Sequence, residues 1–363
     1  MDFITDYGPF IIGIFLFALL VLLHEFGHFI VARRNGVEVE EFGFGFPPRI
    51  FSKQVGNTVY SFNLLPLGGF VKQKGETDGD SRPGTFGSKG LWVKTKILLA
   101  GVGMNVLAAM AIIFVLALIQ LPTLTQAQYR VPADQTIVAQ DVLLQRVEDG
   151  SPAADAGLRS GDVITKLNGK EVTSARQLST RTQAIAGEEA TVTFGRDGAR
   201  ETTSVQLRQG ADVAELGVAP IDREISRYTW AAPLVAVGTV VHMAAGMLSG
   251  LWEVIYELVT GAGQEAARNV AGPVGIVVLL ENISSFGFSY LFFFIALIST
   301  ALAVFNTLPI PALDGGRLAV IAAARASRKQ LTEKVENSIH GVGFVALLAL
   351  IALVTYVDIQ RFF

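Results

Sequence analysis

The feature that most constrains the fold of this chain is an apolar run near its N-terminus that contains the motif HEFGH at residues 24–28. From Pro9 to Ala32 the run has no charged residue outside this motif, and as a helix it would extend about 36 Å, enough to cross a bilayer. Residues four apart lie one turn from each other on one face of a helix, so His24 and His28 should point the same way. The run predicts a membrane-spanning helix that carries two paired histidines.

Two imidazoles placed in this way can bind one zinc ion, and Glu25 beside them can act as general base toward a water molecule. Ionisable groups at membrane depth are costly, so we expect the motif to be functional. The chain has only four histidines, which makes a chance occurrence rare. A polar patch that packs against a neighbouring helix is the weaker explanation. A soluble zinc protease would carry the motif on an amphipathic helix, so the pattern favours a protease that works inside the membrane.

The composition agrees with a membrane protein: 51% of residues are hydrophobic and 17% are charged. The net charge of −3 argues against nucleic acid as a partner. The absence of cysteine excludes disulfides and thiolate ligands, so a zinc ion here must be held by histidine and carboxylate. The N-terminal run lacks a basic n-region and a small-residue cleavage site, so we expect a retained span and not a signal peptide.

Three further stretches are strongly apolar: Ile97–Leu121, Tyr290–Leu308 and Val342–Val357. The segment Pro233–Val259 is ambiguous, because it also carries His242, Glu253 and Glu257. We therefore expect about four transmembrane helices, with Pro233–Val259 as an interfacial helix or a re-entrant pair.

Loop charges support this count. Arg33–Lys96 holds ten Lys or Arg against six acidic residues, and Arg317–Lys334 holds five against one. By the positive-inside rule both loops are cytoplasmic, which requires an even number of spans between them. Both chain ends are then expected outside the cytoplasm.

The segment between the second span and the ambiguous stretch, roughly Ala133 to Pro220, has the composition of a soluble domain. Short alternating strands are separated by glycine turns, and Asn168-Gly169 suits a two-residue hairpin. The string from Val142 through GSPAA and Gly161-Asp to LNGKEV resembles the PDZ domains of bacterial proteases. PDZ domains bind an extended peptide as an added strand. A spacer with no binding role is the alternative, and the loop charges predict an extracytoplasmic position.

Between the first two spans, alternating aromatic and β-branched residues with Gly-Asn and Gly-Gly punctuation predict β-hairpins over 41–51 and 56–71. They are too apolar for a free cytoplasmic loop, so we expect them at the membrane face beside the motif helix. Lys74–Lys89 is predicted to be a flexible linker.

A catalytic zinc site needs a third protein ligand. Asp314 follows an apolar run and a proline-broken segment at Pro309 and Pro311, where non-helical backbone is tolerated only if it lines a cavity. The residues alone leave the choice open among several histidines and carboxylates: Asp314, His242, His340, Glu253, Glu257, Glu281 and Asp358.

At this point the chain resembles the site-2 protease family of intramembrane zinc metalloproteases, and its bacterial RseP branch in particular. The resemblance runs in order through HEFGH, Gly-Phe-Gly, Leu-Pro-Leu-Gly-Gly, the PDZ-like segment, Gly272-Pro-Val-Gly-Ile and NTLPIPALDGG. It departs from the family where a proline is usual after Gly101, and in having a single PDZ-like domain. The resemblance implies one set of roles: zinc ligands His24, His28 and Asp314; catalytic base Glu25; and substrate contacts Asn306, Pro309, Pro311 and Asn105.

The fold class we expect is an α-helical polytopic membrane protein of about four transmembrane helices with membrane-associated β-hairpins and one inserted extracytoplasmic PDZ-like α+β domain. The boundaries predicted are 1–125, 126–221 and 222–363. The resemblance implies cleavage of single-span proteins in the bacterial cytoplasmic (inner) membrane, such as an anti-sigma factor or signal-peptide remnants, with Zn²⁺ as cofactor. The partners expected are those substrates and the lipid bilayer. Two alternatives remain: a metal or proton transporter, and a proteolytically inactive PDZ membrane adaptor.

Overall fold

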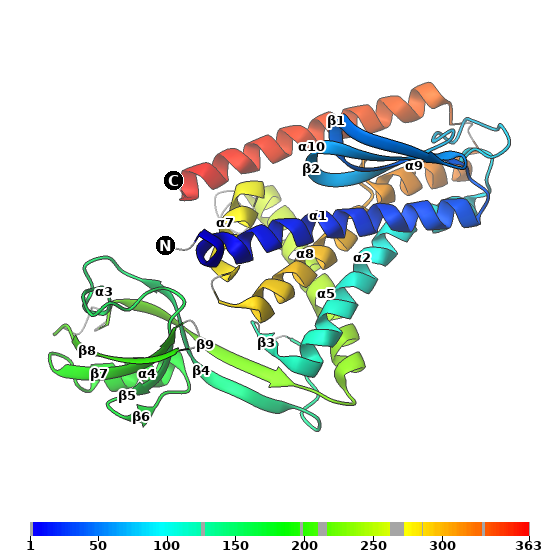
Figure 1. The fold of residues 1–363 in the computed structure, drawn as a ribbon. Helices are drawn as coiled ribbons and strands as arrows, with labels where there is room; N and C mark the ends of the chain where they lie inside the picture. Colours follow the sequence, from blue (N-terminus) through cyan, green and yellow to red (C-terminus); the bar gives the residue numbers. More distant parts are fainter. Residues whose placement is uncertain are drawn as a thin grey trace. The chain divides into compact units, whose positions relative to one another are not determined.

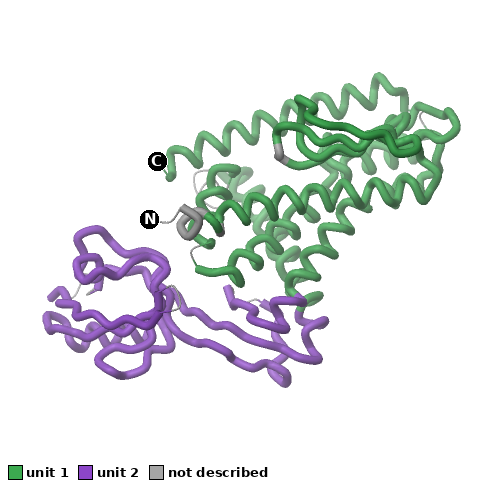
Figure 2. Tube along the Cα trace, in the orientation of Figure 1, with its two compact units in different colours: residues 1–113, 236–363 green, residues 114–235 purple. Residues whose placement is uncertain are grey.

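A computed structural model of the chain describes residues 3–124, 128–196, 199–209, 216–261, 272–284, 286–328 and 331–362. The chain divides into two compact units, of which unit 1 comprises residues 1–113 and 236–363 and unit 2 comprises residues 114–235 (Figures 1 and 2). Unit 1 combines long helices with a small sheet, whereas unit 2 is built mainly of strands.

The helices of unit 1 form where the sequence is apolar over lengths that a bilayer requires. Five described helices are long and apolar enough to cross a membrane, one more than we expected. The long helices are α1 (Phe3–Arg34), α2 (Leu91–Ile119), α5 (Ala232–Thr260), α8 (Phe288–Thr307) and α10 (Glu333–Phe362), and the short ones are α7 (Pro273–Ser284) and α9 (Asp314–Ala326).

Helix α5 decides one question that the sequence left open. It is a single uninterrupted helix of 29 residues, so the prediction of a re-entrant pair over Pro233–Val259 is wrong. The physical reason is that its one proline, Pro233, lies in the first turn, where no backbone hydrogen bond is lost. Its glycines lower helix propensity but do not break the hydrogen-bond ladder.

The loop before α2 is packed, so the prediction of a flexible linker over Lys74–Lys89 is also wrong. Phe86 is buried, and the fully buried Lys94 ammonium forms an ion pair with Asp78 and donates to the Gly87 carbonyl at 2.8 Å. The backbone N–H of Asp78 donates in turn to the buried carboxylate of Glu336 at 2.7 Å. A buried charge must be paired, and this pairing fixes the loop against α10.

Strands β1 (Val39–Val55) and β2 (Thr58–Gln73) form the sheet of unit 1, as the aromatic alternation predicts. Residues 41–44 of β1 have partners in two segments of β2, 59–62 and 69–72, so β2 borders them on both sides. Aromatic rings of the sheet contact those of α1 just beyond the histidine motif: Phe29 lies 5.1 Å from Phe42 and 6.0 Å from Tyr60, centroid to centroid. The sheet is thereby held beside the motif helix.

Unit 2 is a seven-stranded antiparallel sheet in the order β3-β9-β4-β5-β7-β8, with β6 paired to β5. The predicted hairpin is present, since Asn168 and Gly169 both have positive φ, 48° and 75°. The elements are β3 (Leu121–Thr123), β4 (Thr136–Val147), α3 (Pro152–Asp155), β5 (Val163–Leu167), β6 (Lys170–Glu171), α4 (Ala175–Gln183), β7 (Glu189–Arg196), β8 (Ala199–Gln206) and β9 (Val218–Arg227).

The borders of unit 2 lie outside the predicted 126–221. Strand β9 pairs along the whole of β4, from Val147↔Val218 to Thr136↔Arg227, and β3 pairs with the far end of β9. Composition alone assigns β3 and the end of β9 to the segments that flank unit 2. Backbone hydrogen bonds nevertheless make them part of its sheet.

Candidate metal centre and active site

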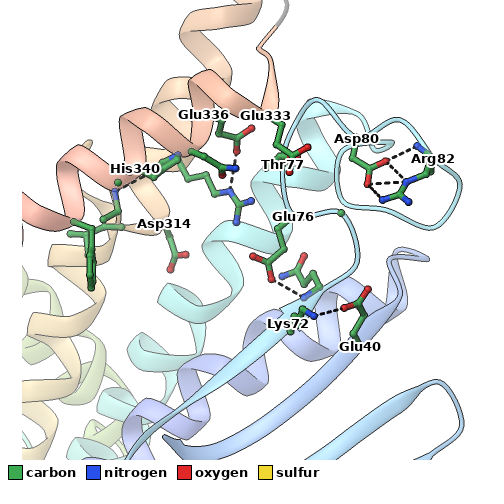
Figure 3. A pocket seen from close by; sticks show the side chains of 18 residues that line it. Glu40, Lys72, Glu76, Thr77, Asp80, Arg82, Asp314, Glu333, Glu336 and His340 are labelled. Atoms are coloured by element: carbon green, nitrogen blue, oxygen red, sulfur yellow. Dashed lines mark hydrogen bonds and ion pairs between the residues drawn. The ribbon is translucent and has the colours of Figure 1, made fainter. Parts of the chain in front are cut away.

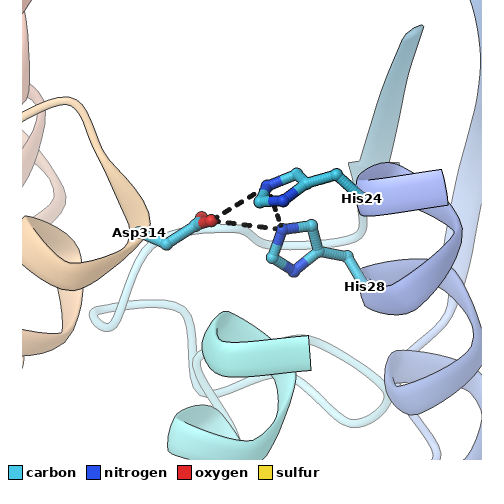
Figure 4. A group of neighbouring side chains, drawn as sticks. All are labelled: His24, His28 and Asp314. Atoms are coloured by element: carbon cyan, nitrogen blue, oxygen red, sulfur yellow. Dashed lines mark hydrogen bonds and ion pairs between the residues drawn. The ribbon is translucent and has the colours of Figure 1, made fainter. Parts of the chain in front are cut away.

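The two histidines of the motif meet on one face of α1, as their spacing predicts. The Nε2 atoms of His24 and His28 are 3.1 Å apart, and both residues are buried. The Oδ2 atom of Asp314 lies 3.2 Å from Nε2 of His24 and 3.3 Å from Nε2 of His28 (Figure 4). Among the described residues these three form the one group of three or more such side chains with metal-ligating spacing.

Asp314 reaches the histidines because the chain folds back sharply between α8 and α9. Helix α8 ends at Thr307, and Pro309 and Pro311 prevent its continuation. A Cβ atom at Gly316 would overlap the carbonyl group of Ile310, so only glycine allows this close return. Asp314 then occupies the first turn of α9, with its carboxylate turned toward α1.

The geometry fits a zinc ion. Two ligand atoms at 2.0–2.1 Å from a tetrahedral zinc are separated by about 3.3 Å, and the three distances here are 3.1, 3.2 and 3.3 Å. Oδ2 of Asp314 is buried, and the two Nε2 atoms are its polar contacts among the described residues, so a cation between the three atoms would meet no competing donor. Gly101 of α2 faces the pair, and a Cβ there would lie 2.5 Å from Nε2 of His28.

Helix α2 contacts the nitrogen of each imidazole that points away from Asp314. Nδ1 of His28 donates to the Ile97 carbonyl at 2.8 Å, and the amide of Asn105 lies 3.2 Å from Nδ1 of His24. Such contacts fix the orientation and tautomer of a metal-binding histidine. Ile97, Gly101 and Asn105 are spaced four apart, so the sequence alone could have predicted that they lie on one face of α2.

Glu25 lines the same cavity as the three ligand candidates, a space of about 240 Å³. Val71 of β2 lines this cavity too, and a Cβ at Gly69 would lie 3.7 Å from Cγ of Glu25, so residues 69–73 of β2 run beside this carboxylate. Asn306, at the end of α8, and Arg317, one turn after Asp314, also line this cavity. The arrangement brings a general-base candidate, a metal site and a strand edge together.

Three residues predicted to contact substrate do not line this cavity. Asn105 is fully buried, and its side-chain amide contacts Nδ1 of His24, one of the ligand candidates. Pro309 and Pro311 shape the turn before Asp314, and Pro311 lines a different, apolar space with residues of α10. Asn306 does line the cavity. Contact of these four residues with substrate stays a prediction.

The other candidates for third ligand lie elsewhere. Asp358 accepts hydrogen bonds from the backbone N–H groups of Gly272 and Gly275 at the start of α7. Glu281 is exposed on α7, and His242 bonds the carbonyl of Gly238 within α5.

The profile of Peptidase family M50 matches residues 12–350. The chain belongs to peptidase family M50. A protein of Nostoc named putative zinc metalloprotease is 31% identical over 345 residues, covering 92% of this chain and 91% of the relative. One of the same description from Clostridium perfringens is 30% identical over 358 residues, covering 96% and 98%.

A third relative of this M50 peptidase is the regulator of sigma-W protease RasP of Bacillus subtilis, 27% identical over 436 residues, covering 96% of this chain and 98% of the relative. A solved PDZ domain of an SdrC-like protein from Listeria monocytogenes is similar to 23% of the chain, with 20% identity and a TM-score of 0.22.

Family membership decides among the function classes that the sequence left open. The protein is a zinc metalloprotease of a family that cleaves within membranes, and its cofactor is Zn²⁺. The transporter and the inactive adaptor are therefore set aside. The apolar helices agree with a membrane protein.

Proposed function

We propose that His24, His28 and Asp314 hold the catalytic zinc ion and that Glu25 is the general base. The observation that carries this proposal is the convergence of two Nε2 atoms and one carboxylate oxygen at 3.1–3.3 Å, in a cavity that Glu25 also lines. When bound, zinc supplies a Lewis acid that polarises the scissile carbonyl and makes water easier to deprotonate. Glu25 takes the proton from the attacking water and returns it to the leaving nitrogen.

The substrate we propose is the transmembrane segment of a single-span membrane protein. A helix hides its carbonyl groups in its own hydrogen bonds, so the segment must be unwound before hydrolysis. The outer segment of β2, residues 69–73, can offer the unwound chain new backbone partners. Its position supports this role, because Val71 and Gln73 line the cavity together with Glu25, and a Cβ at Gly69 would lie 3.7 Å from Cγ of Glu25. Asn306 borders the cavity from α8 and is placed to bind the substrate backbone.

Water would reach the site through a second, polar cavity of about 770 Å³ (Figure 3). It shares Gln73, Glu76, Asp314 and Arg317 with the smaller cavity, so the two spaces adjoin at these side chains. Its walls come from the two basic loops and the start of α10, which the positive-inside rule assigns to the cytoplasm. We propose a cytoplasmic water supply.

We propose four membrane crossings, with α5 at the interface and unit 2 outside the cytoplasm. The contact of Asp78 with Arg325 at 3.6 Å supports a shared side for the two basic loops, so an even number of crossings separates them. Helices α2 and α8 supply two. If α5 also crossed the membrane, one more crossing would be needed to keep the number even. The described helix between α5 and α8 is α7, which has 12 residues and extends only about 18 Å, short of a bilayer core of about 30 Å.

The name of the Bacillus relative, a regulator of sigma-W protease, supports a regulatory substrate such as an anti-sigma factor. Signal-peptide remnants share the same chemistry, an apolar helix inserted in the cytoplasmic membrane.

The test is cleavage of a model single-span substrate by the purified protein in detergent. Glu25→Gln should lower kcat by about 10²–10⁴-fold, because it removes the base, and should leave zinc content unchanged, because it keeps every ligand. A chelator should abolish wild-type cleavage, and added zinc should restore it. Wild-type turnover by Glu25→Gln would exclude Glu25 as the base.

A further inference from the structure

Helix α10 carries a histidine that the chemistry proposed above does not use. Nδ1 of His340 accepts a hydrogen bond from the backbone N–H of Ala312, 3.1 Å away. Ala312 lies two residues before Asp314, in the short segment between α8 and α9. The contact thus joins the last helix of the chain to the segment that delivers the proposed third ligand (Figure 3).

The backbone of Ala312 is strained. Its φ is +82°, and only two other described non-glycine residues, Asn168 and Arg328, have positive φ. A Cβ atom disfavours this region, so an alanine stays there only where its surroundings impose the conformation. The following turn, in which the N–H of Leu313 donates to the carbonyl of Ile310 at 3.1 Å, leaves the N–H of Ala312 to His340.

One face of α10 holds this segment at three points. Glu336, His340 and Gly343 are spaced four and three apart, so they lie on the same side of the helix. The Glu336 carboxylate lies 3.4 Å from Nε of Arg317, one turn after Asp314. A Cβ at Gly343 would overlap Pro311, so the helix backbone packs directly on the turn.

The second nitrogen of His340 shows which of its contacts matters. Because Nδ1 accepts a hydrogen bond, the proton of the neutral ring belongs on Nε2. Nε2 is buried and has no hydrogen-bond partner within the described part of the chain. The hydrogen bond from Ala312 is therefore the one polar contact of this ring within the described part of the chain, and the ring also lines the larger cavity.

We propose that His340 is a positioning residue of the zinc site. Its Nδ1 holds Ala312 in the left-handed conformation, and this sets the direction from which the Asp314 carboxylate meets His24 and His28. The inference rests on the proposed role of Asp314 as a zinc ligand.

Three substitutions separate the hydrogen bond from packing. His340→Asn keeps an acceptor close to the position of Nδ1, His340→Gln moves the acceptor toward that of Nε2, and His340→Leu has none. His242→Leu is the matched control, because His242 is also a helix histidine whose Nδ1 bonds the backbone, but it is exposed on α5.

The measurements are zinc affinity, by competition with a chromogenic chelator, and kcat and KM on the model substrate. His340→Leu and His340→Gln should bind zinc about 10- to 100-fold more weakly, as is typical when a contact that orients a metal ligand is removed. Their kcat should fall while KM stays near the wild-type value. His340→Asn and His242→Leu should both match the wild type in zinc affinity.

Two results would overturn the positioning role: wild-type zinc affinity in His340→Leu, or equal affinities for the Asn and Gln variants. The second comparison still decides if His340→Leu does not fold. Asp314→Ala, measured in parallel, distinguishes failure of this inference from failure of the proposal that Asp314 is a zinc ligand. If Asp314→Ala keeps its zinc, the proposed site itself is wrong, whereas if it loses zinc and every His340 variant behaves as wild type, only the role of His340 is wrong.

Discussion

The side-chain amide of Asn105 lies 3.2 Å from Nδ1 of His24, the nitrogen on the far side of the ring from Asp314. When Nε2 of His24 is directed at a metal, Nδ1 carries the proton and needs an acceptor. Oδ1 of Asn105 is buried and has no hydrogen-bond partner among the described residues. Turning the amide by half a rotation brings Oδ1 to Nδ1, and amide orientation is assigned from such networks.

Asn105→Leu should therefore weaken zinc binding by about 10- to 100-fold, measured by chelator competition, because it leaves the Nδ1–H of His24 without an acceptor. Asn105→Asp keeps the acceptor and should bind zinc at least as well as the wild type. A leucine variant with unchanged zinc affinity would show that Asn105 does not orient His24.

Asp314→Ala should lose bound zinc as well as activity, as His24→Ala and His28→Ala should, because two protein ligands do not hold a catalytic zinc ion. Metal analysis of the purified variants checks this. Glu281→Ala is the matched control, a carboxylate that is exposed on α7. Full zinc occupancy in Asp314→Ala would move the third ligand to another residue.

Cysteine labelling tests the membrane topology, and the cysteine-free chain gives a clean background. Single cysteines at Ser81, Gln183 and Gln360 occupy exposed positions in the basic loop, unit 2 and the end of α10. In intact cells an impermeant reagent should label the cysteines at 183 and 360 and spare the one at 81. Protection of the cysteine at 360 would mean that α5 crosses the membrane after all.

Unit 2 should control which substrates reach the site and take no part in hydrolysis. A deletion of Thr136–Arg227 tests this, because these two residues are paired across β4 and β9 and a short turn can join the ends. The deletion keeps Asp134, whose carboxylate accepts hydrogen bonds from the backbone N–H groups of Thr229 and Ala231, just before α5 begins.

The deletion variant should cleave a pre-clipped substrate at the wild-type rate and also cleave a substrate that retains a bulky outer domain, which the full chain should refuse. If unit 2 instead recruits substrate by binding its C-terminus, the deletion should slow cleavage of both. Loss of all cleavage with zinc still bound would count against both roles. The comparison of the two substrates on one variant distinguishes these outcomes.

Local periodicity was enough to predict several parts of this protein. The pairing of His24 with His28 follows from 3.6 residues per turn, and the turn at Asn168-Gly169 follows from the tolerance of both residues for positive φ. The apolar runs predicted the long helices, because the hydrophobic length that a bilayer demands is a property of the run itself. Helix α5 was harder to predict, since its charges and glycines obscured an uninterrupted helix.

Only the tertiary structure decided which distant residues complete the site. Seven side chains were candidates for third ligand, and the fold-back between α8 and α9 brings Asp314 to the histidine pair. Asn105 contacts His24 from α2, and His340 contacts Ala312 from α10. The residue pattern of one helix does not predict which face of another helix it will contact. A helix face is fixed by the sequence of that helix, whereas the contact between two faces depends on how the whole chain packs.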